Sequence, residues 1–255
     1  MMNPGTSETA QATLAMYIDV LGRLVTAQPE AVRAAATVVA DAVGAGGVVH
    51  VHDTGHMIGQ ELVSRTGGLV AFSRLEYGAH VSSGGIAREG AVSLSPDEVV
   101  AATTRLIGWT FDQRTVRVGD ALVLSSVSGV SVPVVELAVQ ARERGIPVVA
   151  LTSVTFSTQL ASKHPSGQRL CDVANVVLDN LAPYGDAAQV LDGFDAKVVP
   201  ISGVAGAALM WAVVAEATAM LVGRGIAPSV YPSINLPDGP QLVAEVEAQY
   251  RSAGR

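Results

Sequence analysis

The chain has 255 residues, with 16 basic and 23 acidic side chains and a formal net charge of −7. This charge argues against a general nucleic-acid binder, which needs a basic surface for phosphates. Hydrophobic residues make up 49% of the chain and charged residues 15%, so intrinsic disorder is excluded because enough apolar surface can be buried on folding. The single cysteine, Cys171, cannot form an internal disulfide.

Two helices are predicted before any strand. Apolar residues recur at helical spacing from Thr6 to Ala27, and Pro29 opens a second helix that ends at the glycines around position 44. The N-terminus lacks a basic segment followed by an apolar one, so no secretion signal is expected. A later apolar stretch begins at Gly203 but carries Glu216, a costly residue in lipid. We therefore expect a cytoplasmic protein with no membrane contact, and a buried helix at this stretch.

From Gly47 onward, short β-branched apolar runs alternate with helix-like segments, which is typical of parallel strands buried on both faces. The predicted strands are Val48–His52, Leu69–Phe72, Ala121–Ser126, Pro147–Leu151 and Ala174–Leu178. The predicted helices after Gly47 are Met57–Thr66, Asp97–Ile107, Val132–Arg144 and Gly203–Gly223. The polar stretch Ser153–Arg169 has no periodicity and is expected to be an ordered loop that carries function. A short final helix is expected after Pro240.

This order predicts an α/β fold: a three-layer, doubly wound, flavodoxin-like sheet of about five parallel strands, with two N-terminal helices. We expect one domain over residues 1–255. It would consist of a helical segment over residues 1–46 and an α/β core with a C-terminal helix over residues 47–255. Ligands of such sheets bind at the carboxyl ends of the strands, so the residues that follow each strand are the candidates for a site.

The first of these turns does not fit a nucleotide. The first strand ends in HVHDTGHM, which lacks the Gly-x-Gly-x-x-Gly spacing of dinucleotide sites, and no Gly-x4-Gly-Lys-Ser/Thr motif occurs. Asp53 in this turn would also repel a pyrophosphate. We expect no cofactor.

Hydroxyl groups follow several strands and favour a phosphate ligand. The third strand ends in LSSVSGVS before a helix, where hydroxyls and free backbone N–H groups can hold a phosphate without a lysine. The alternative is a serine-rich turn and helix cap with no ligand. The candidate phosphate-binding and sugar-binding residues in the three turns are Thr54, Gly55, His56, Ser126, Ser128, Gly129, Ser131, Thr152 and Ser153. A phosphorylated small molecule is therefore the expected ligand.

Several segments carry a family resemblance that spans nearly the whole chain. They are DTGHM from Asp53, ELVSRTGGL from Glu61, GAHVSSG from Gly78, SSVSGVSVP from Ser125, ALTS from Ala150, SKHPSGQRL from Ser162, VLDN from Val177 and YGDA from Tyr184. With these segments the chain resembles the SIS (sugar isomerase) domain of phosphosugar isomerases and phosphosugar-binding regulators. In that domain a Ser-x-Ser-Gly-x-Ser/Thr turn takes the phosphate, which the resemblance assigns to Ser126–Ser131.

The chain departs from the family pattern in the residues that bear on the substrate and the base. Asp53 stands where the family usually has glycine, and Met57 where a polar residue is common. Glu76 and Tyr77 replace a His-Glu pair, and the segment before Glu61 is about two residues short.

Related SIS proteins often complete a site with a second subunit. The resemblance therefore implies a homodimer or a larger homo-oligomer.

Aldose–ketose isomerisation needs a base for a proton beside a carbonyl and groups that move protons between two oxygens. Our candidates for catalysis are Glu61 as the base, His164 for ring opening or proton transfer, and His80 as a second histidine. Glu61 could equally be a surface carboxylate that pairs with Arg65 at i+4. The alternative for His164 is that it forms hydrogen bonds within its own loop.

Two other kinds of site are weighed and set aside. His50 and His52 share a face of one strand, with His56 just beyond, but the only nearby carboxylate is Asp53, so we expect no metal. The two lysines, Lys163 and Lys197, lie outside apolar runs, which disfavours Schiff-base chemistry.

The sequence thus predicts a phosphosugar-binding SIS protein that acts as an aldose–ketose sugar-phosphate isomerase through an enediol. Two alternatives stay open. The protein could be a non-catalytic sensor or regulator that binds a sugar phosphate, or it could be a phosphosugar lyase or etherase that begins with the same proton abstraction. The expected partner is a small sugar phosphate.

Overall fold

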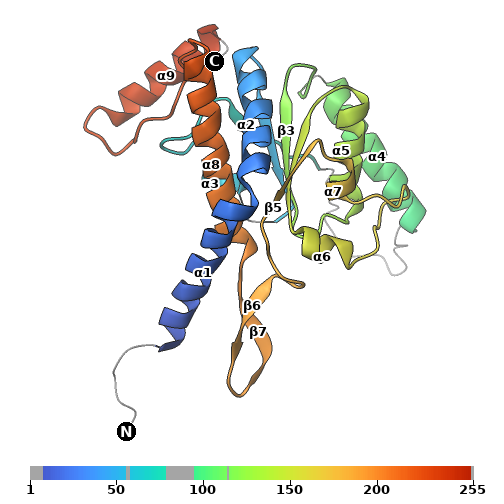
Figure 1. Cartoon of the computed structure of the whole chain (residues 1–255). Coiled ribbons are helices and arrows are strands. Elements are labelled where there is room, and N and C mark those ends of the chain that lie inside the picture. The colour runs from blue at the N-terminus through green and yellow to red at the C-terminus, as the bar shows by residue number, and fades with distance from the viewer. Residues whose placement is uncertain (1–7, 56–57, 79–94, 114, 254–255) are drawn as a thin grey trace, which may run out of the picture.

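A computed structural model describes residues 8–55, 58–78, 95–113 and 115–253. Its central sheet has five parallel strands in the order β2-β1-β3-β4-β5 (Figure 1). The strands are β1 (Val49–Asp53), β2 (Phe72–Arg74), β3 (Ala121–Ser125), β4 (Val148–Thr152) and β5 (Val176–Asp179). The predicted doubly wound sheet of five parallel strands is confirmed, and the strand order is that of a flavodoxin-like fold.

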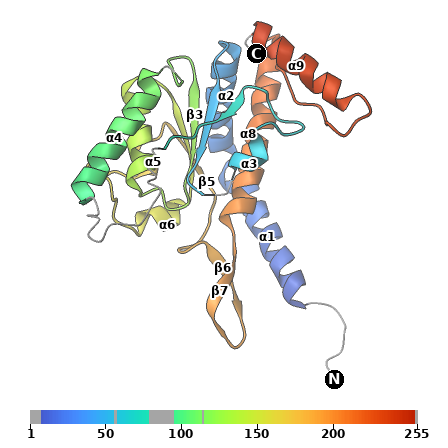
Figure 2. The ribbon, with the colours of Figure 1, turned by 180° about the vertical axis from the view of Figure 1, so that it is seen from behind.

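Helices cover both faces of the sheet and make the outer two layers (Figures 1 and 2). One layer contains α2 (Pro29–Gly44) and α8 (Ser202–Gly223), and the other contains α4 (Pro96–Asp112), α5 (Val132–Glu143) and α7 (Leu170–Val173). Among the described residues, α8 is the one helix whose length and hydropathy would suffice to cross a membrane. Its buried side chains belong to the hydrophobic core that it shares with α2 and the sheet, and this packing accounts for its apolar composition.

Alternating side chains of the strands fill two separate cores. Val123 of β3 packs on the side of α2 and α8, whereas Leu122 and Leu124 pack on the side of α4 and α5. The alternation follows from the period of two in a strand. In β1 the same rule sends Val49 and Val51 into the first core, so His50 and His52 point to the opposite face.

Outside the sheet, α1 (Glu8–Ala27) lies beside an antiparallel hairpin of β6 (Ala187–Leu191) and β7 (Phe194–Pro200) (Figures 1 and 2). The Thr13 hydroxyl donates a hydrogen bond to Gln189 Oε1 (2.6 Å), and the Tyr17 hydroxyl donates to the carbonyl of Pro200 (2.9 Å). This hairpin was not predicted from the sequence. The chain ends in α9 (Gly239–Ala253), the expected final helix.

Two predicted elements differ in the structure. The helix predicted over Met57–Thr66 is reduced to α3 (Gly59–Leu62), and the second strand occupies residues 72–74 instead of 69–72. Leu69 forms an isolated antiparallel bridge with Val230, and its buried side chain belongs to the core between the sheet, α2 and α8. Ser153–Arg169 is a loop, as expected, except for the short helix α6 (Val154–Thr158).

Candidate functional site

A pocket of about 430 Å³ lies where β1 and β3 end, and we call it the serine pocket. The residues that line it are Thr54, Gly55, Ser126, Val127, Ser128, Val130, Phe156, Leu160, Ala161 and Lys163. Thr54, Gly55, Ser126 and Ser128 had been predicted to bind phosphate, and the structure brings these four together. Hydroxyl groups, backbone N–H groups and one ammonium group can all bind a phosphate oxygen.

The serine turn depends on a glycine and on a loop that folds back over it. Gly129 has φ +61° and its N–H donates to Ser126 Oγ (3.3 Å). The N–H of Lys163 donates to the carbonyl of Val130 (2.9 Å), and the N–H of Leu170 donates to the carbonyl of Gly129 (2.8 Å). These bonds hold the loop after α6 against the turn, which is why Lys163 lines the pocket.

Two of the predicted ligand hydroxyls, those of Thr152 and Ser153, are already bonded to backbone carbonyl groups, and only that of Thr152 supports the serine turn. Thr152 Oγ1 donates to the carbonyl of Val127 (3.0 Å), and Ser153 Oγ donates to the carbonyl of Ala182 (2.6 Å). Both residues are fully buried, and Ser153 also caps α6 by accepting the N–H of Phe156. Because neither residue lines the serine pocket, their geometry favours a positioning role.

Ser131 is the N-cap residue of α5, and its side chain makes no capping hydrogen bond. It does not line the serine pocket. His56, the remaining candidate of the first turn, lies outside the described residues.

The carboxylate of Asp53 accepts hydrogen bonds from backbone N–H groups of the first turn. Its Oδ2 accepts hydrogen bonds from the N–H groups of Ile58 (2.7 Å) and Gly59 (3.0 Å), and its Oδ1 accepts from the N–H of Gly55 (3.2 Å) and the Ser125 hydroxyl (3.0 Å). An anionic ligand would need such donors. The carboxylate of Asp53 therefore takes the place that an anion would need in this turn.

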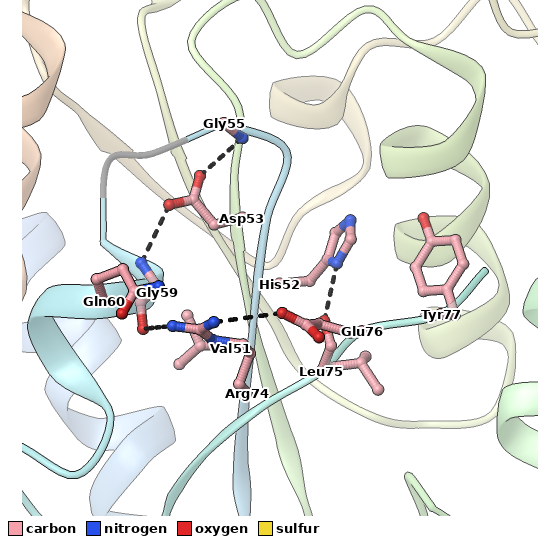
Figure 3. Close-up of a pocket in the computed structure, with 10 residues that line it drawn as sticks. All are labelled: Val51, His52, Asp53, Gly55, Gly59, Gln60, Arg74, Leu75, Glu76 and Tyr77. Atoms are coloured by element: carbon pink, nitrogen blue, oxygen red, sulfur yellow. Dashed lines mark hydrogen bonds and ion pairs between the residues drawn. The ribbon is translucent and has the colours of Figure 1, made fainter.

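A second pocket, of about 480 Å³, lies between β1 and β2, and we call it the β1–β2 pocket (Figure 3). The residues that line it are Val51, His52, Asp53, Gly55, Gly59, Gln60, Arg74, Leu75, Glu76 and Tyr77. Arg74 Nη1 lies 3.3 Å from Glu76 Oε1, and Arg74 Nη2 donates to the carbonyl of Gly59 (3.1 Å). Gly55 lines both pockets, so the two cavities adjoin.

Glu61 is not among the residues that line the serine pocket or the β1–β2 pocket. Its Oε1 accepts a hydrogen bond from Trp211 Nε1 of α8 (3.2 Å) and lies 3.6 Å from Arg65 Nη2. The pair with Arg65 is the alternative that the sequence left open. The structure thus directs the predicted base towards α8.

His164 is held inside its loop. Its Nε2 lies 2.7 Å from Glu136 Oε2 of α5, and its Nδ1 accepts the N–H of Ser166 (3.2 Å). Burial opposes ionisation of Glu136, but hydrogen bonds from His164 and Gln140 outweigh it, so the pKa of Glu136 lies below its usual value. Because both nitrogens of His164 have partners, this geometry favours a structural role. The third catalytic candidate, His80, lies outside the described residues.

The histidines of β1 have different partners. His50 Nε2 lies 3.2 Å from Asp120 Oδ2 in a buried pair, whereas the Nδ1 of His52 lies 3.0 Å from the carbonyl of Leu75. In the part of the chain that the structure describes, no three His, Cys, Asp or Glu side chains gather closely enough to hold a metal ion.

Two features of this edge of the sheet were not predicted from the sequence. The sequence predicted an anion site without a lysine, whereas Lys163 lines the serine pocket. The polar segment SKHPSGQRL, which contains Lys163, was the sequence feature that could have indicated this lysine. Its position over the serine turn, however, depends on its backbone hydrogen bonds to Val130 and Gly129. The sequence considered His52 only as a metal ligand and gave no role to Arg74 or Tyr77, whereas all three residues line the β1–β2 pocket.

Comparison with known proteins agrees with the family resemblance of the sequence motifs. A family model described as the SIS domain matches residues 14–153. A UPF0309 protein of Streptomyces coelicolor is 36% identical over 238 residues and covers 91% of each chain, and one of Brucella anthropi is 37% identical over 205 residues and covers 80% of each chain.

Two solved structures are also similar. The phosphoheptose isomerase of Neisseria gonorrhoeae has a TM-score of 0.48 at 16% identity, with 84% of this chain and 97% of that chain covered. The sugar isomerase domain of an RpiR transcription factor from Sphaerobacter thermophilus has a TM-score of 0.47 at 18% identity. The match covers 95% of this chain and 98% of that chain. From the family match and the UPF0309 relatives, the chain belongs to the SIS domain family.

Proposed function

We propose that this protein binds a sugar phosphate and that the serine pocket takes the phosphate group. The observation that carries the proposal is that Ser126, Ser128 and Lys163 line the same pocket. Membership of the SIS domain family supports the same ligand class. Thr54 and Gly55 complete the lining from the β1 side.

The polar groups at this edge differ in how freely they can bind an anion. Ser128 is half-buried and Lys163 is exposed, so both can reach a ligand without first breaking a buried contact. The hydroxyls of Thr152 and Ser153 are already bonded to carbonyl groups. Hydrogen bonds between charged partners contribute about 1.5–3 kcal/mol each, roughly twice the neutral value. Lys163 should therefore contribute more to phosphate affinity than any single serine.

The test is a calorimetric titration with inorganic phosphate and with D-fructose 6-phosphate. Lys163→Met should weaken both ligands about tenfold, and Ser128→Ala should weaken both several-fold. Lys197→Met is the matched control, because Lys197 is an exposed lysine of β7 and does not line the serine pocket. Equal affinity for phosphorylated and unphosphorylated fructose would contradict the proposal.

We further propose that the protein interconverts aldose and ketose phosphates through an enediol. The polar β1–β2 pocket, which adjoins the serine pocket at Gly55, supports this step because it offers proton donors and acceptors beside the phosphate. Deuterium uptake from heavy water at the carbon beside the carbonyl would support isomerisation. Product analysis would separate it from a lyase, which begins with the same proton abstraction and then releases a substituent.

A non-catalytic sensor of sugar phosphates is the second candidate. The placement of Glu61 against Trp211 and of His164 against Glu136 favours it, because these two of the three catalytic candidates are held in other contacts. Tight binding of a sugar phosphate without any deuterium uptake would select the sensor.

We also propose that the chain forms a homodimer or a larger homo-oligomer. The proposal is supported by α1, which extends beyond the sheet beside the hairpin (Figure 2) and leaves Leu14 63% and Ile18 71% exposed. Ile18→Glu should lower the molar mass measured by light scattering after size-exclusion chromatography. A monomeric wild-type protein at micromolar concentration would contradict this proposal.

A further inference from the structure

We propose that the β1–β2 pocket binds the carbon chain of the sugar phosphate and that His52 is the base that moves the proton during isomerisation. The inference rests on the proposed function, because it needs a ligand whose phosphate is held in the serine pocket. It gives the proton-transfer role to a residue that the family motifs do not mark.

The hydrogen bond to Leu75 fixes the protonation of the His52 ring. A carbonyl oxygen can only accept a hydrogen bond, so the Nδ1 of His52, 3.0 Å from the Leu75 carbonyl, must carry the proton. In the neutral imidazole the Nε2 then has a free lone pair. No described residue is hydrogen-bonded to this nitrogen, and Figure 3 shows it pointing away from Leu75. His52 is thus oriented as a base, as Nδ1 partners orient many functional histidines.

Tyr77 reinforces this orientation and offers a donor of its own. Its ring stacks on His52 with centroids 4.8 Å apart and an interplanar angle of 27°. The Tyr77 hydroxyl is buried without a hydrogen-bond partner in the described part of the chain, and it points to the same side as the free nitrogen of His52 (Figure 3). Burial raises the pKa of Tyr77 to about 12, so the hydroxyl keeps its proton at neutral pH. An unpaired buried hydroxyl is costly unless a ligand or water completes it.

The opposite wall of the β1–β2 pocket suits a hydroxylated chain. Arg74 is held by Glu76 and by the carbonyl of Gly59, and Gln60 lies beside it on the same wall (Figure 3). A guanidinium group and an amide can donate to several hydroxyl groups at once. Since Gly55 lines both pockets, one ligand can place its phosphate in the serine pocket and its carbons beside His52.

The proton transfer balances without a cofactor. The C–H bond beside the carbonyl breaks, its proton moves to Nε2 of His52, and its electron pair forms the C=C bond of an enediolate whose former carbonyl oxygen carries the negative charge. The neighbouring hydroxyl passes its proton to this oxygen. The imidazolium then protonates the former carbonyl carbon, and the second oxygen, now without its proton, becomes the new carbonyl. The Tyr77 hydroxyl would stabilise the charge that develops on the oxygen in between.

The experiment measures deuterium uptake by NMR in heavy water with D-fructose 6-phosphate, D-ribulose 5-phosphate and D-sedoheptulose 7-phosphate. His52→Gln should lower the uptake rate at least 100-fold, within the usual range for the loss of a general base, while the dissociation constant of inorganic phosphate stays within twofold of the wild type. His50→Gln is the matched control on the same strand, and it should keep the wild-type rate because His50 faces Asp120.

A second measurement does not depend on turnover or on the stability of a variant. Nitrogen-15 NMR of the wild-type protein should find His52 protonated at Nδ1, and a bound ketose phosphate should shift its Nε2 signal whereas inorganic phosphate should not. The inference is overturned if His52→Gln exchanges at the wild-type rate, if the wild type binds all three ketose phosphates without exchange, or if none of them shifts the Nε2 signal. Failure of the phosphate site would instead be seen as phosphate affinity unaffected by Lys163→Met.

Discussion

The Nε2 of His164 lies 2.7 Å from Oε2 of Glu136, and only 8% and 10% of the two side chains are exposed. This pair ties the loop after α6 to α5. Lys163 directly precedes His164 and lines the serine pocket. The pair therefore holds Lys163 beside the serine turn. This positioning is a structural role for the segment SKHPSGQRL, which contains both Lys163 and His164.

The first prediction concerns the loss of this pair. His164→Leu should lower the free energy of unfolding by about 2–3 kcal/mol, because it leaves the low-pKa carboxylate of Glu136 buried without its histidine partner. Urea denaturation measures this change. The double variant His164→Leu with Glu136→Leu should lose less than the sum of the two single variants. Additive losses would contradict the coupling between the two residues.

The same variant should also weaken phosphate binding. Without the bond to Glu136 the loop can move, and Lys163 then loses entropy when it binds an anion. We expect the dissociation constant of inorganic phosphate to rise several-fold in His164→Leu under conditions where the protein stays folded. Unchanged affinity would show that Lys163 is positioned by its backbone bond to Val130 alone.

The second prediction is a pH dependence of stability from His50. Burial lowers the pKa of His50 below 6.5, and the hydrogen bond and charge of Asp120 offset only part of this. The unfolded chain therefore binds the proton more readily than the folded chain. The stability is fully present above pH 6.5 and is lost as the pH falls from 6.5 through the lower pKa of the folded state.

Urea denaturation between pH 7.5 and pH 5 tests this. The wild type should lose stability with falling pH, and His50→Gln should lose less over the same window. The Asp120 carboxylate is the charged group in direct contact with His50, and Glu136 should titrate only at lower pH because its pKa is below 4.5. Equal slopes for wild type and His50→Gln would assign the pH dependence to other groups.

The third prediction concerns Asp53, the residue that departs from the family glycine. Asp53→Asn should tighten inorganic phosphate binding about two- to tenfold, because a negative charge next to the serine pocket is removed. The variant should also lose about 1–2 kcal/mol of stability, since an amide cannot accept all the hydrogen bonds that the carboxylate accepts. Calorimetry and urea denaturation measure the two effects.

The control for Asp53→Asn is Asp192→Asn in the exposed turn of the hairpin. It changes the net charge equally but lies outside both pockets, so its phosphate affinity should match the wild type. If both variants tighten binding equally, the effect comes from net charge and not from the position of Asp53.

The sheet could be predicted from the sequence because its signal is local. Runs such as the one from Ala121 to Leu124 are apolar throughout, and each core takes alternate residues of the run. The serine turn could be predicted for the same reason, since it follows a strand directly. The hairpin could not, because its residues are mostly exposed or half-buried and carry no clear apolar alternation.

The rest of the site could not be predicted because it depends on contacts between distant segments. Glu61 pairs with Trp211, which is 150 positions away, and His164 pairs with Glu136. Both residues have the types that catalysis needs, but the tertiary fold gives them other partners. His52 looks in the sequence like one of several histidines, and only its contacts with Leu75 and Tyr77 distinguish it.

The last prediction tests the serine turn itself. Gly129 has φ +61°, and a Cβ at this position would lie 3.1 Å from Leu170 Cβ and 3.1 Å from Thr152 Oγ1. Gly129→Ala therefore adds steric crowding to the cost of a left-handed backbone, which is about 1–2 kcal/mol by itself. Gly145→Ala is the matched control, because Gly145 has φ +73° and open space around the added methyl group. Urea denaturation should show the larger loss for Gly129→Ala, and only that variant should weaken phosphate binding, because a relaxed turn moves Ser126 and Ser128. Equal losses of stability with unchanged phosphate affinity would mean that the turn tolerates the crowding and that its shape does not determine binding.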